Sequence, residues 1–244
     1  MNRIIEINEV RKRYRMNEVE IWALKGVNLE ISKREFFGIV GPSGSGKSTL
    51  MYVIGGLMRP ETGKVIIEGT DITRLDDDEL SVFRHKNIGF VFQMYHLIPR
   101  MSALKNVMLP LKLRNVARKE AERKALEALK MVGMAHRANH RPSQMSGGEQ
   151  QRVAIARAIV TEPKIILGDE PTGNVDRKSS IQIMELFKRL NKDLGVTIVM
   201  VTHNLELISY CDRAARMVDG RIVKIYSPNE YSKLIADMAS GENV

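Results

Sequence analysis

One glycine-rich run, between an apolar stretch and a helical pattern, constrains this chain more than any other feature. The run matches the pattern G-x-x-x-x-G-K-[ST] in full and reads Gly41, Pro42, Ser43, Gly44, Ser45, Gly46, Lys47, Ser48. Its glycines let successive backbone N–H groups turn inward as an anion-binding nest. An apolar stretch at 36–40 precedes it, and residues from Ser48 and Thr49 onward open a helix whose N-terminus also favours phosphate. The run therefore predicts a phosphate-binding loop in a strand–loop–helix unit, with Lys47 facing the outer phosphates and Ser48 binding Mg²⁺.

The rest of the chain alternates between strand and helix patterns. Four short apolar runs are typical of buried parallel strands, and they lie at 36–40, 88–92, 165–167 and 197–201. Apolar residues with period two before residue 32, and the run 65–67, predict short antiparallel strands. We therefore expect an α/β fold, with a mainly parallel sheet and an N-terminal antiparallel β subdomain.

The segment 94–141 interrupts this alternation with helical patterns. Residues 118–131 are strong helix formers, with Ala121, Ala125 and Leu129 on one side and Gly133 as a stop. We interpret the segment as an inserted helical subdomain. Asp76 and Glu79 have the spacing of a capping box and predict a short helix, although adjacent carboxylates there leave a metal site as an alternative.

Composition narrows the class of protein. A chain of 244 residues, 43% hydrophobic and 27% charged, is long enough for one globular domain and short for two. The single cysteine, Cys211, has no intramolecular partner, which fits a reducing compartment. No stretch approaches the roughly 18 apolar residues of a membrane helix, and the charged N-terminus lacks a signal-peptide core. We therefore expect a soluble, cytosolic protein.

The net charge of +9 is concentrated in one part of the chain. Residues 105–141 hold ten Lys or Arg and three Glu, an excess of seven positive charges. Such a segment is compatible with a solvated helical face, with a nucleic-acid surface or with an anionic membrane surface.

Polar residues with matching chemistry follow the other apolar runs. Asp169 and Glu170 end the run that begins at 165, where Asp169 suits a Mg²⁺ shell and Glu170 is a natural general base for water. Gln93 follows the run 88–92, and His203 follows the run 197–201 after one threonine. Ligands of open parallel sheets bind outside the carboxyl ends of the strands. Gln93 is therefore predicted to bridge Mg²⁺ and water, and His203 to donate to the γ-phosphate.

A second glycine-rich helix start lies far along the chain. Ser146 and Glu149 form a capping box around Gly147 and Gly148, ahead of a helical pattern. A capped helix alone does not explain two consecutive glycines, because glycine destabilises a helix. The pair leaves backbone N–H groups exposed as a second anion site, while the phosphate loop already holds one triphosphate. We infer that Ser146, Gly147 and Gly148 cap the γ-phosphate of ATP bound to another subunit.

These motifs together resemble the nucleotide-binding subunits of ABC transporters, over nearly the whole chain. The resemblance identifies 41–49 as the phosphate loop, Gln93 as the glutamine loop, 146–148 as the signature and His203 as the switch. It places Tyr14, with Trp22 nearby, where the family stacks an aromatic ring on adenine. Segments 75–80, 92–99 and 171–174 resemble the lipoprotein-releasing and macrolide-exporter group within the family.

The family resemblance implies an assembly. Two subunits would pair head to tail around two ATP and Mg²⁺, with Ser48, Gln93 and Asp169 at the metal and Lys47, Gln93, Glu170 and His203 in catalysis. Each would contribute residues in trans to the other's nucleotide, namely Ser146, Gly147, Gly148, Glu149 and Asp176. The helical region and the Gln93 region would meet an integral membrane permease, which places the chain in the cytoplasm on the inner face of the cell membrane.

The same resemblance suggests how the single domain is divided. Residues of about 1–93 and 160–225 would form the core with its β subdomain, 94–159 the helical subdomain, and 226–244 a C-terminal tail. Glu149 stands where the family usually has glutamine, which puts its role as a direct ligand in question. Met145 in place of leucine, and Gly168 before Asp169, are smaller departures.

Three other functions compete with a transport ATPase. A soluble ABC ATPase acting on nucleic acid fits the basic charge, but the single phosphate loop and the lack of a coiled-coil arm argue against it. A small-molecule kinase would have no use for the signature. An ABC ATPase of the cell-division type would regulate a membrane partner. The subgroup resemblance favours export or work on an envelope protein, and the transported substrate would be selected by the membrane subunit.

Overall fold

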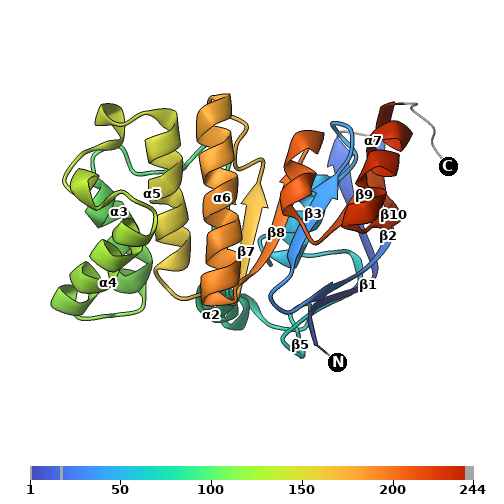
Figure 1. Cartoon of the computed structure of the whole chain (residues 1–244). Helices are drawn as coiled ribbons and strands as arrows, with labels where there is room; N and C mark the ends of the chain where they lie inside the picture. The colour runs from blue at the N-terminus through green and yellow to red at the C-terminus, as the bar shows by residue number, and fades with distance from the viewer. Residues whose placement is uncertain (1, 17–18, 240–244) are drawn as a thin grey trace.

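The computed structural model describes residues 2–16 and 19–239, and its larger sheet has six strands (Figure 1). Their order is β10-β9-β3-β8-β7-β6, and β10 is the antiparallel edge strand of an otherwise parallel sheet. The strands are β3 (Phe36–Val40), β6 (Ile88–Phe92), β7 (Ile165–Asp169), β8 (Thr197–Thr202), β9 (Arg213–Val218) and β10 (Arg221–Tyr226). The mainly parallel sheet predicted from the four apolar runs is confirmed.

A smaller antiparallel sheet is formed mainly by the N-terminal part of the chain. Its order is β2-β1-β4-β5, with β1 (Arg3–Met16), β2 (Val19–Ser32), β4 (Thr62–Ile67) and β5 (Thr70–Asp71). The antiparallel pairing is as predicted, but β1 and β2 are 14 residues each and not short. Register shifts such as the one between Ile7 and Val10 interrupt the period-two pattern while the pairing continues.

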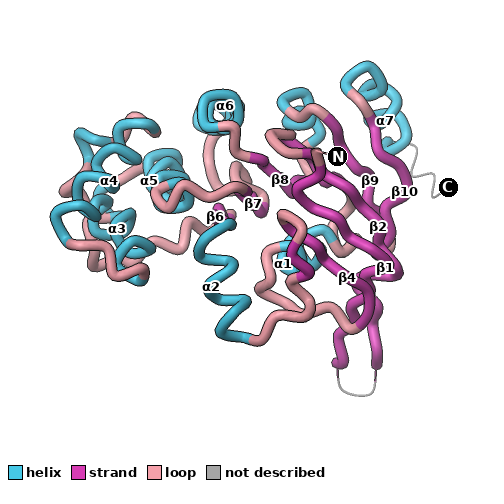
Figure 2. The backbone as a smooth tube through the Cα atoms, turned by 90° about the horizontal axis from the view of Figure 1, so that it is seen from below, coloured by secondary structure: helices cyan, strands magenta, loops and turns pink. Residues whose placement is uncertain are grey.

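Two hydrophobic cores cover the two faces of the large sheet. Figure 2 shows the backbone elements on those faces, with α6 (Arg177–Leu194) on one side of β8 and α1 (Lys47–Ile54) on the other. Because successive strand residues point to opposite faces, Phe36 of β3 joins one core and Phe37 the other. The first core packs against α6 and α5 (Gly147–Ile159), and the second packs against α1 and the antiparallel sheet.

Helices gather at one end of the molecule, on the left of Figure 1. There α3 (Ala103–Leu113), α4 (Arg118–Met131) and α5 pack on one another. The predicted helix 118–131 is confirmed, with Ala121, Ala125 and Leu129 buried and Gly133 at a φ of +72° after its end. The division of the chain at residues 93/94 and 159/160 stays a prediction.

The acidic stretch before residue 80 caps a helix, as its spacing predicts. In α2 (Asp77–Asn87), Oδ1 of Asp76 accepts from the Glu79 amide at 2.8 Å, and Oε2 of Glu79 accepts from the Asp76 amide at 3.0 Å. Acidic residues in the first turn also complement the positive end of the helix dipole. The helix leads directly into β6.

The last helix, α7 (Tyr231–Ala239), packs on a third, smaller core. This core joins Val40 at the end of β3, Ile208, and Tyr231 and Leu234 of α7. The Tyr231 hydroxyl donates to the carbonyl of Cys211 at 3.0 Å. The remaining elements are short 3-10 turns at η1 (Ala135–Arg137), η2 (Pro142–Gln144), η3 (Leu205–Tyr210) and η4 (Pro228–Glu230). In the described part of the chain, no helix has the length and apolar character needed to cross a bilayer.

Candidate active site

A cavity of about 570 Å³ gathers many of the predicted site residues where the phosphate loop meets the strand ends. Its lining comes from β1 and β2 of the smaller sheet, from the phosphate loop and the start of α1, and from the turns after β6, β7, β8 and β9. Its lining comprises Tyr14, Ile21, Trp22, Ala23, Ser43, Gly44, Gly46, Lys47, Ser48, Thr49, Gln93, Glu170, His203, Asp219 and Gly220. Residues far apart in sequence therefore converge here, as their positions at strand ends predicted.

The phosphate loop runs from the end of β3 to the start of α1. Gly46 precedes the helix with a φ of +98°, a conformation that favours glycine, and a Cβ on Gly41 would lie 2.1 Å from a backbone oxygen. Lys47 lies beneath the loop and donates to the carbonyl oxygens of Gly41 at 3.0 Å and Pro42 at 2.8 Å. Burial lowers the pKa of Lys47, while the nearby Glu170 and Asp169 carboxylates oppose that shift.

Asp169 ends β7 between two hydroxyl groups. Its Oδ1 accepts from Ser48 at 2.9 Å, and its Oδ2 accepts from Tyr52 at 2.7 Å. Burial, followed by the bond to Asp169, raises the pKa of Tyr52 to about 12. A hydroxyl and a carboxylate beside a phosphate loop are the hard oxygen donors that suit Mg²⁺, so this pair fits the predicted metal role. Tyr52 was not predicted, because a tyrosine inside a helix gives no pattern in the sequence.

Glu170 follows Asp169 and turns out of the sheet. It has a φ of +46°, and its amide donates to the carbonyl of Val201 at 2.9 Å. Its Oε2 accepts from the Thr202 hydroxyl at 3.1 Å, and its Oε1 lies 2.7 Å from Nδ1 of His203. The carboxylate is thus fixed from two sides at the cavity wall. The sequence indicated His203 but not Thr202, which ends β8 as an ordinary strand residue.

Gln93 is held by Asn174 from the loop after β7. Nε2 of Gln93 donates to Oδ1 of Asn174 at 3.3 Å, and Nδ2 of Asn174 donates to the Gln93 carbonyl at 3.1 Å. A Cβ on Gly173 would lie 2.7 Å from Nε2 of Gln93, so a larger residue here would displace the glutamine side chain. The loop 171–176 therefore packs directly on the glutamine.

Two aromatic rings border the other end of the cavity. Tyr14 is 37% exposed, and its hydroxyl contacts Oγ1 of Thr49 at 3.3 Å and donates to Sδ of Met58 at 3.1 Å. Trp22 is 38% exposed, and the Arg13 guanidinium carbon lies 5.5 Å from the centre of a Trp22 ring. Either ring could stack on a base, so Trp22 belongs to the site together with Tyr14.

The signature residues lie outside the lining of this cavity, at the N-terminus of α5. Oγ of Ser146 accepts from the Glu149 amide at 3.2 Å, and Oε2 of Glu149 accepts from the Ser146 amide at 2.8 Å, so the predicted capping box is present. The other Glu149 oxygen pairs with Nε of Arg137 at 3.1 Å. Mainly the bond from the Ser146 amide lowers the pKa of Glu149. The negative charge of Glu149 is therefore balanced by Arg137 and by the helix cap of the same chain.

Asp176 also lies outside the cavity lining and caps α6. Its Oδ1 accepts from the Ser179 amide at 2.9 Å, and its Oδ2 accepts from the Ser179 hydroxyl at 2.6 Å. These two bonds lower the pKa of Asp176. The five residues predicted to act in trans are thus separate from the residues that gather around the phosphate loop.

Known proteins resemble this chain over most of its length. Residues 24–173 match the family model described as ABC transporter. The lipoprotein-releasing system ATP-binding protein LolD of Geobacter metallireducens is 49% identical, over 91% of this chain and 99% of its own. The macrolide export ATP-binding/permease protein MacB of Chlorobaculum tepidum is also 49% identical, over 90% of this chain but only 34% of that longer protein.

The structural comparison agrees with the sequence comparison. A dimeric structure of the ATP-binding cassette MJ0796, in a post-hydrolysis state bound to ADP and Pi, has a TM-score of 0.85 and 45% identity. It covers 92% of this chain and 99% of that chain. A TM-score of this size over most of both chains means that the two share one fold. The chain therefore belongs to the ABC transporter family, as an ATP-binding subunit that hydrolyses ATP.

Proposed function

We propose that two copies of this chain close head to tail around two ATP molecules. The observation that carries the proposal is the separation of the phosphate loop from the signature helix within one chain. The cavity is lined by the phosphate loop, Lys47 and Glu170, but the N-terminus of α5 does not contribute to its lining. A second copy would supply Ser146, Gly147 and Gly148 over the γ-phosphate, and Asp176 beside them.

Within each half, the geometry supports a division of labour in hydrolysis. The loop amides and Lys47 would hold the β- and γ-phosphates, and the aromatic rings of Tyr14 and Trp22 would bind the base. Ser48, Asp169 and Gln93 would hold Mg²⁺, which supplies charge neutralisation on the phosphate oxygens when bound. Tyr52 orients the Asp169 carboxylate toward Ser48.

Glu170 is placed to act as the general base. A water oxygen attacks the γ-phosphorus, its proton passes to the Glu170 carboxylate, and the bond to the ADP oxygen breaks. Thr202 and His203 hold that carboxylate at 3.1 Å and 2.7 Å, so it need not reorganise when it accepts the proton. From this position beside Glu170, the exposed His203 ring would also face the γ-phosphate.

Substitution of Glu170 by Gln tests this proposal. The variant should bind ATP with unchanged affinity, lose most of its hydrolysis, and accumulate as an ATP-bound dimer in light scattering. Lys47→Ala should remain monomeric at the same ATP concentration, because it lacks the charge that holds the phosphates. A Glu170→Gln protein that stays monomeric at saturating ATP and Mg²⁺ would contradict the head-to-tail assembly.

We further infer that a membrane permease docks beside Gln93, with the chain peripheral on the cytoplasmic face of the membrane. A groove of about 400 Å³ lies between α2 and α5, next to the glutamine loop. Its lining is apolar and basic, and includes Leu57, Arg84, His85, Phe90, Phe92, His96, Pro110 and Arg157. Such a groove fits a short amphipathic helix with an acidic residue. The names of LolD and MacB favour export or lipoprotein release as the work performed.

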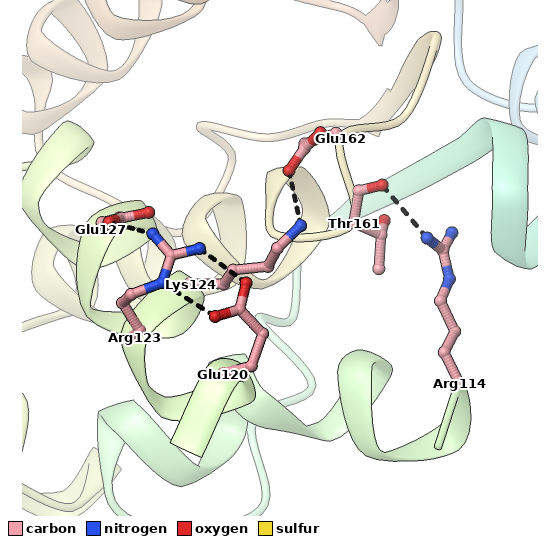
Figure 3. A network of polar contacts seen from close by, with 7 residues as sticks. All are labelled: Arg114, Glu120, Arg123, Lys124, Glu127, Thr161 and Glu162. Carbon is pink, nitrogen blue, oxygen red and sulfur yellow. Dashed lines mark hydrogen bonds and ion pairs between the residues drawn. The ribbon is translucent and has the colours of Figure 1, made fainter. Parts of the chain in front are cut away.

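We call the groove and the adjoining surface of α3 and α4 the docking face. Several cations of the basic segment 105–141 near it are already bound within the chain, so it has fewer unpaired charges than its composition indicates (Figure 3). Arg123 pairs with Glu120 and Glu127, and Lys124 pairs with Glu162. Arg114 donates to backbone carbonyls of His85 and Thr161 beside the groove. Three exposed cations lie where α3 ends and α4 begins, and they pair with no acid in the described residues: Lys112, Arg118 and Lys119.

Charge reversal at these three positions tests the docking face. Lys112→Glu, Arg118→Glu and Lys119→Glu together should weaken co-purification with the permease in detergent, while ATP hydrolysis by the purified chain stays unchanged. Lys192→Glu on α6 is the matched control on another surface. Unchanged co-purification of the triple variant would contradict a role for this face.

A further inference from the structure

We propose that the Tyr95 hydroxyl is the positioning group that holds the signature helix to the glutamine loop. This inference rests on the proposed function, because it concerns how the signature is presented to a second copy. Tyr95 lies two residues after Gln93, and its hydroxyl donates to the backbone oxygen of Asn174 at 2.8 Å. Asn174 is also the residue that forms two hydrogen bonds with Gln93. The hydroxyl therefore lies where the glutamine loop and the loop 171–176 meet.

The same hydroxyl also lies against the first glycine of the signature. A Cβ built on Gly147 would lie 2.7 Å from Oη of Tyr95 and 3.2 Å from the Asn174 oxygen. Gly147 occupies a helical position with no positive φ, so its backbone conformation does not require glycine. A Cβ here would instead press on the Tyr95 hydroxyl and the Asn174 oxygen, so the close packing favours glycine. One phenolic oxygen of the glutamine loop thus donates to the 171–176 loop and lies where a Cβ at the start of α5 would stand.

Further contacts fix the glutamine loop along the length of α5. Gln151, which is fully buried, donates to the carbonyl oxygens of Phe92 at 3.2 Å and Pro171 at 2.6 Å. Arg157 donates to the carbonyl oxygens of Tyr95 at 2.8 Å and His96 at 2.5 Å. Gly147 and Arg157 are ten residues apart, or about 15 Å along a helix. The segment 92–96 is therefore hydrogen-bonded to α5 at two positions along the helix, Gln151 and Arg157.

The second signature glycine makes an equivalent contact with α6. A Cβ on Gly148 would lie 2.6 Å from the Ser179 hydroxyl, and that hydroxyl is bound by Asp176. Both glycines thus serve close packing, and both contacts lead to the loop 171–176. A displacement of Gln93 by nucleotide would reach the start of α5 through Asn174 and Tyr95.

Tyr95→Phe isolates this hydroxyl, because it keeps the ring and removes only the hydrogen bond. In the ATP-free monomer, we expect amide hydrogen exchange at Gly173, Glu149 and Gln150 to accelerate by about two- to tenfold, the effect of one lost hydrogen bond. In the Glu170→Gln background, the ATP-driven dimer should weaken by a similar factor. The ATP affinity of the monomer should not change.

Tyr226→Phe is the matched control, because it removes a tyrosine hydrogen bond to Asp237 far from the signature. It should leave exchange at Glu149 and Gln150, and the dimer constant, unchanged. Equal exchange in Tyr95→Phe and the wild type, or a loss of ATP affinity in the monomer, would overturn the proposal. Because the exchange measurement needs no dimer, a failure of the head-to-tail assembly is distinguishable from a failure of this inference.

A rescue experiment separates positioning from a general loss of packing. Gly147→Ala alone should place its methyl group against the Tyr95 hydroxyl and accelerate the same amides. In the double variant with Tyr95→Phe, the nearest remaining atoms are the Asn174 oxygen at 3.2 Å and a ring carbon at 3.7 Å. Exchange in the double variant should be slower than the sum of the two single effects. Strict additivity would contradict a direct contact between the two groups.

Discussion

The Tyr52 hydroxyl donates to Oδ2 of Asp169 at 2.7 Å, on the carboxylate whose Oδ1 accepts from Ser48 at 2.9 Å. Ser48 lies in the first turn of α1, and Tyr52 lies in the next turn of the same helix. The carboxylate at the end of β7 is therefore oriented by two successive turns of the helix that begins at the phosphate loop. Its orientation is fixed without nucleotide, which suits the metal-binding role proposed for it.

Tyr52→Phe should raise the Mg²⁺ concentration needed for half-maximal hydrolysis by roughly tenfold, because outer hydrogen bonds orient metal-binding carboxylates. The measurement is ATPase rate against free Mg²⁺ at fixed, saturating ATP. Tyr226→Phe is the control and should show the wild-type Mg²⁺ dependence. If Tyr52→Phe follows the wild-type curve, Tyr52 does not orient the metal ligand.

Ser146→Arg should leave ATP binding by the monomer intact and prevent the ATP-driven dimer. The bulky cation would occupy the surface where the second nucleotide is expected. The change also removes a helix cap, which costs about 1 kcal/mol. Ser102→Arg is the control for that loss, because Ser102 caps α3 through the Lys105 amide at 3.3 Å. A dimer that forms equally well with Ser146→Arg would exclude α5 from the interface.

Glu149→Gln should leave stability and dimerisation within about twofold of the wild type, because glutamine also accepts from the Ser146 amide. Glu149→Ala should lower the free energy of unfolding by about 1 kcal/mol, since the cap is lost. Thermal unfolding and light scattering with ATP measure the two effects. A dimer much tighter in Glu149→Gln would mean that the native charge repels the partner's γ-phosphate despite Arg137.

Glu68→Gln should make the free energy of unfolding less dependent on pH in the acidic range. Hydrogen bonds from Lys164 and Lys33 lower the pKa of Glu68, whose side chain is 16% exposed. A lowered folded-state pKa adds stability that is present above the ordinary carboxyl pKa and is lost as pH falls through the folded value. At pH 7 the variant should lose about 1 kcal/mol and melt roughly 2–4 °C lower.

The pH dependence provides the check on this assignment. The difference in melting temperature between Glu68→Gln and the wild type should shrink as pH falls below about 4.5, where the wild-type carboxylate begins to lose its advantage. Glu162→Gln is the control, because Glu162 is 78% exposed in its ion pair with Lys124. Its melting temperature should match the wild type throughout. A constant difference for Glu68→Gln down to pH 3 would contradict the ionic origin.

The sequence predicted four of the parallel strands, β3, β6, β7 and β8, and the phosphate loop, because all of them depend on local patterns. It did not predict β9, where Arg213 and Arg216 interrupt an otherwise small, apolar run. The structure explains the first of these charges: the Arg213 guanidinium pairs with Glu35 at 2.6 Å and lies over the ring of Phe37. Partners 178 residues away cannot be found from periodicity.

The candidate site divides in the same way. Lys47, Asp169 and Glu170 were found because each belongs to a motif whose spacing carries the chemistry. The groups that orient them, Tyr52 and Thr202, were not found, since they come from ordinary positions of a helix and a strand. Glu149 was found as a capping residue, but its neutralisation by Arg137 depends on the packing of α5 against the turn at η1.

The small core beneath α7 affects how much of the chain can be removed. Tyr231 and Leu234 share that core with Val40, the residue before the phosphate loop, and with Ile208, which follows the His203 turn. A shortened protein that stops at Tyr226 would open apolar surface behind both segments at once. Its turnover of ATP would then change even though no group that touches the nucleotide had been deleted. Residues 231–238 thus support the phosphate loop and the His203 turn by packing against the residues next to them.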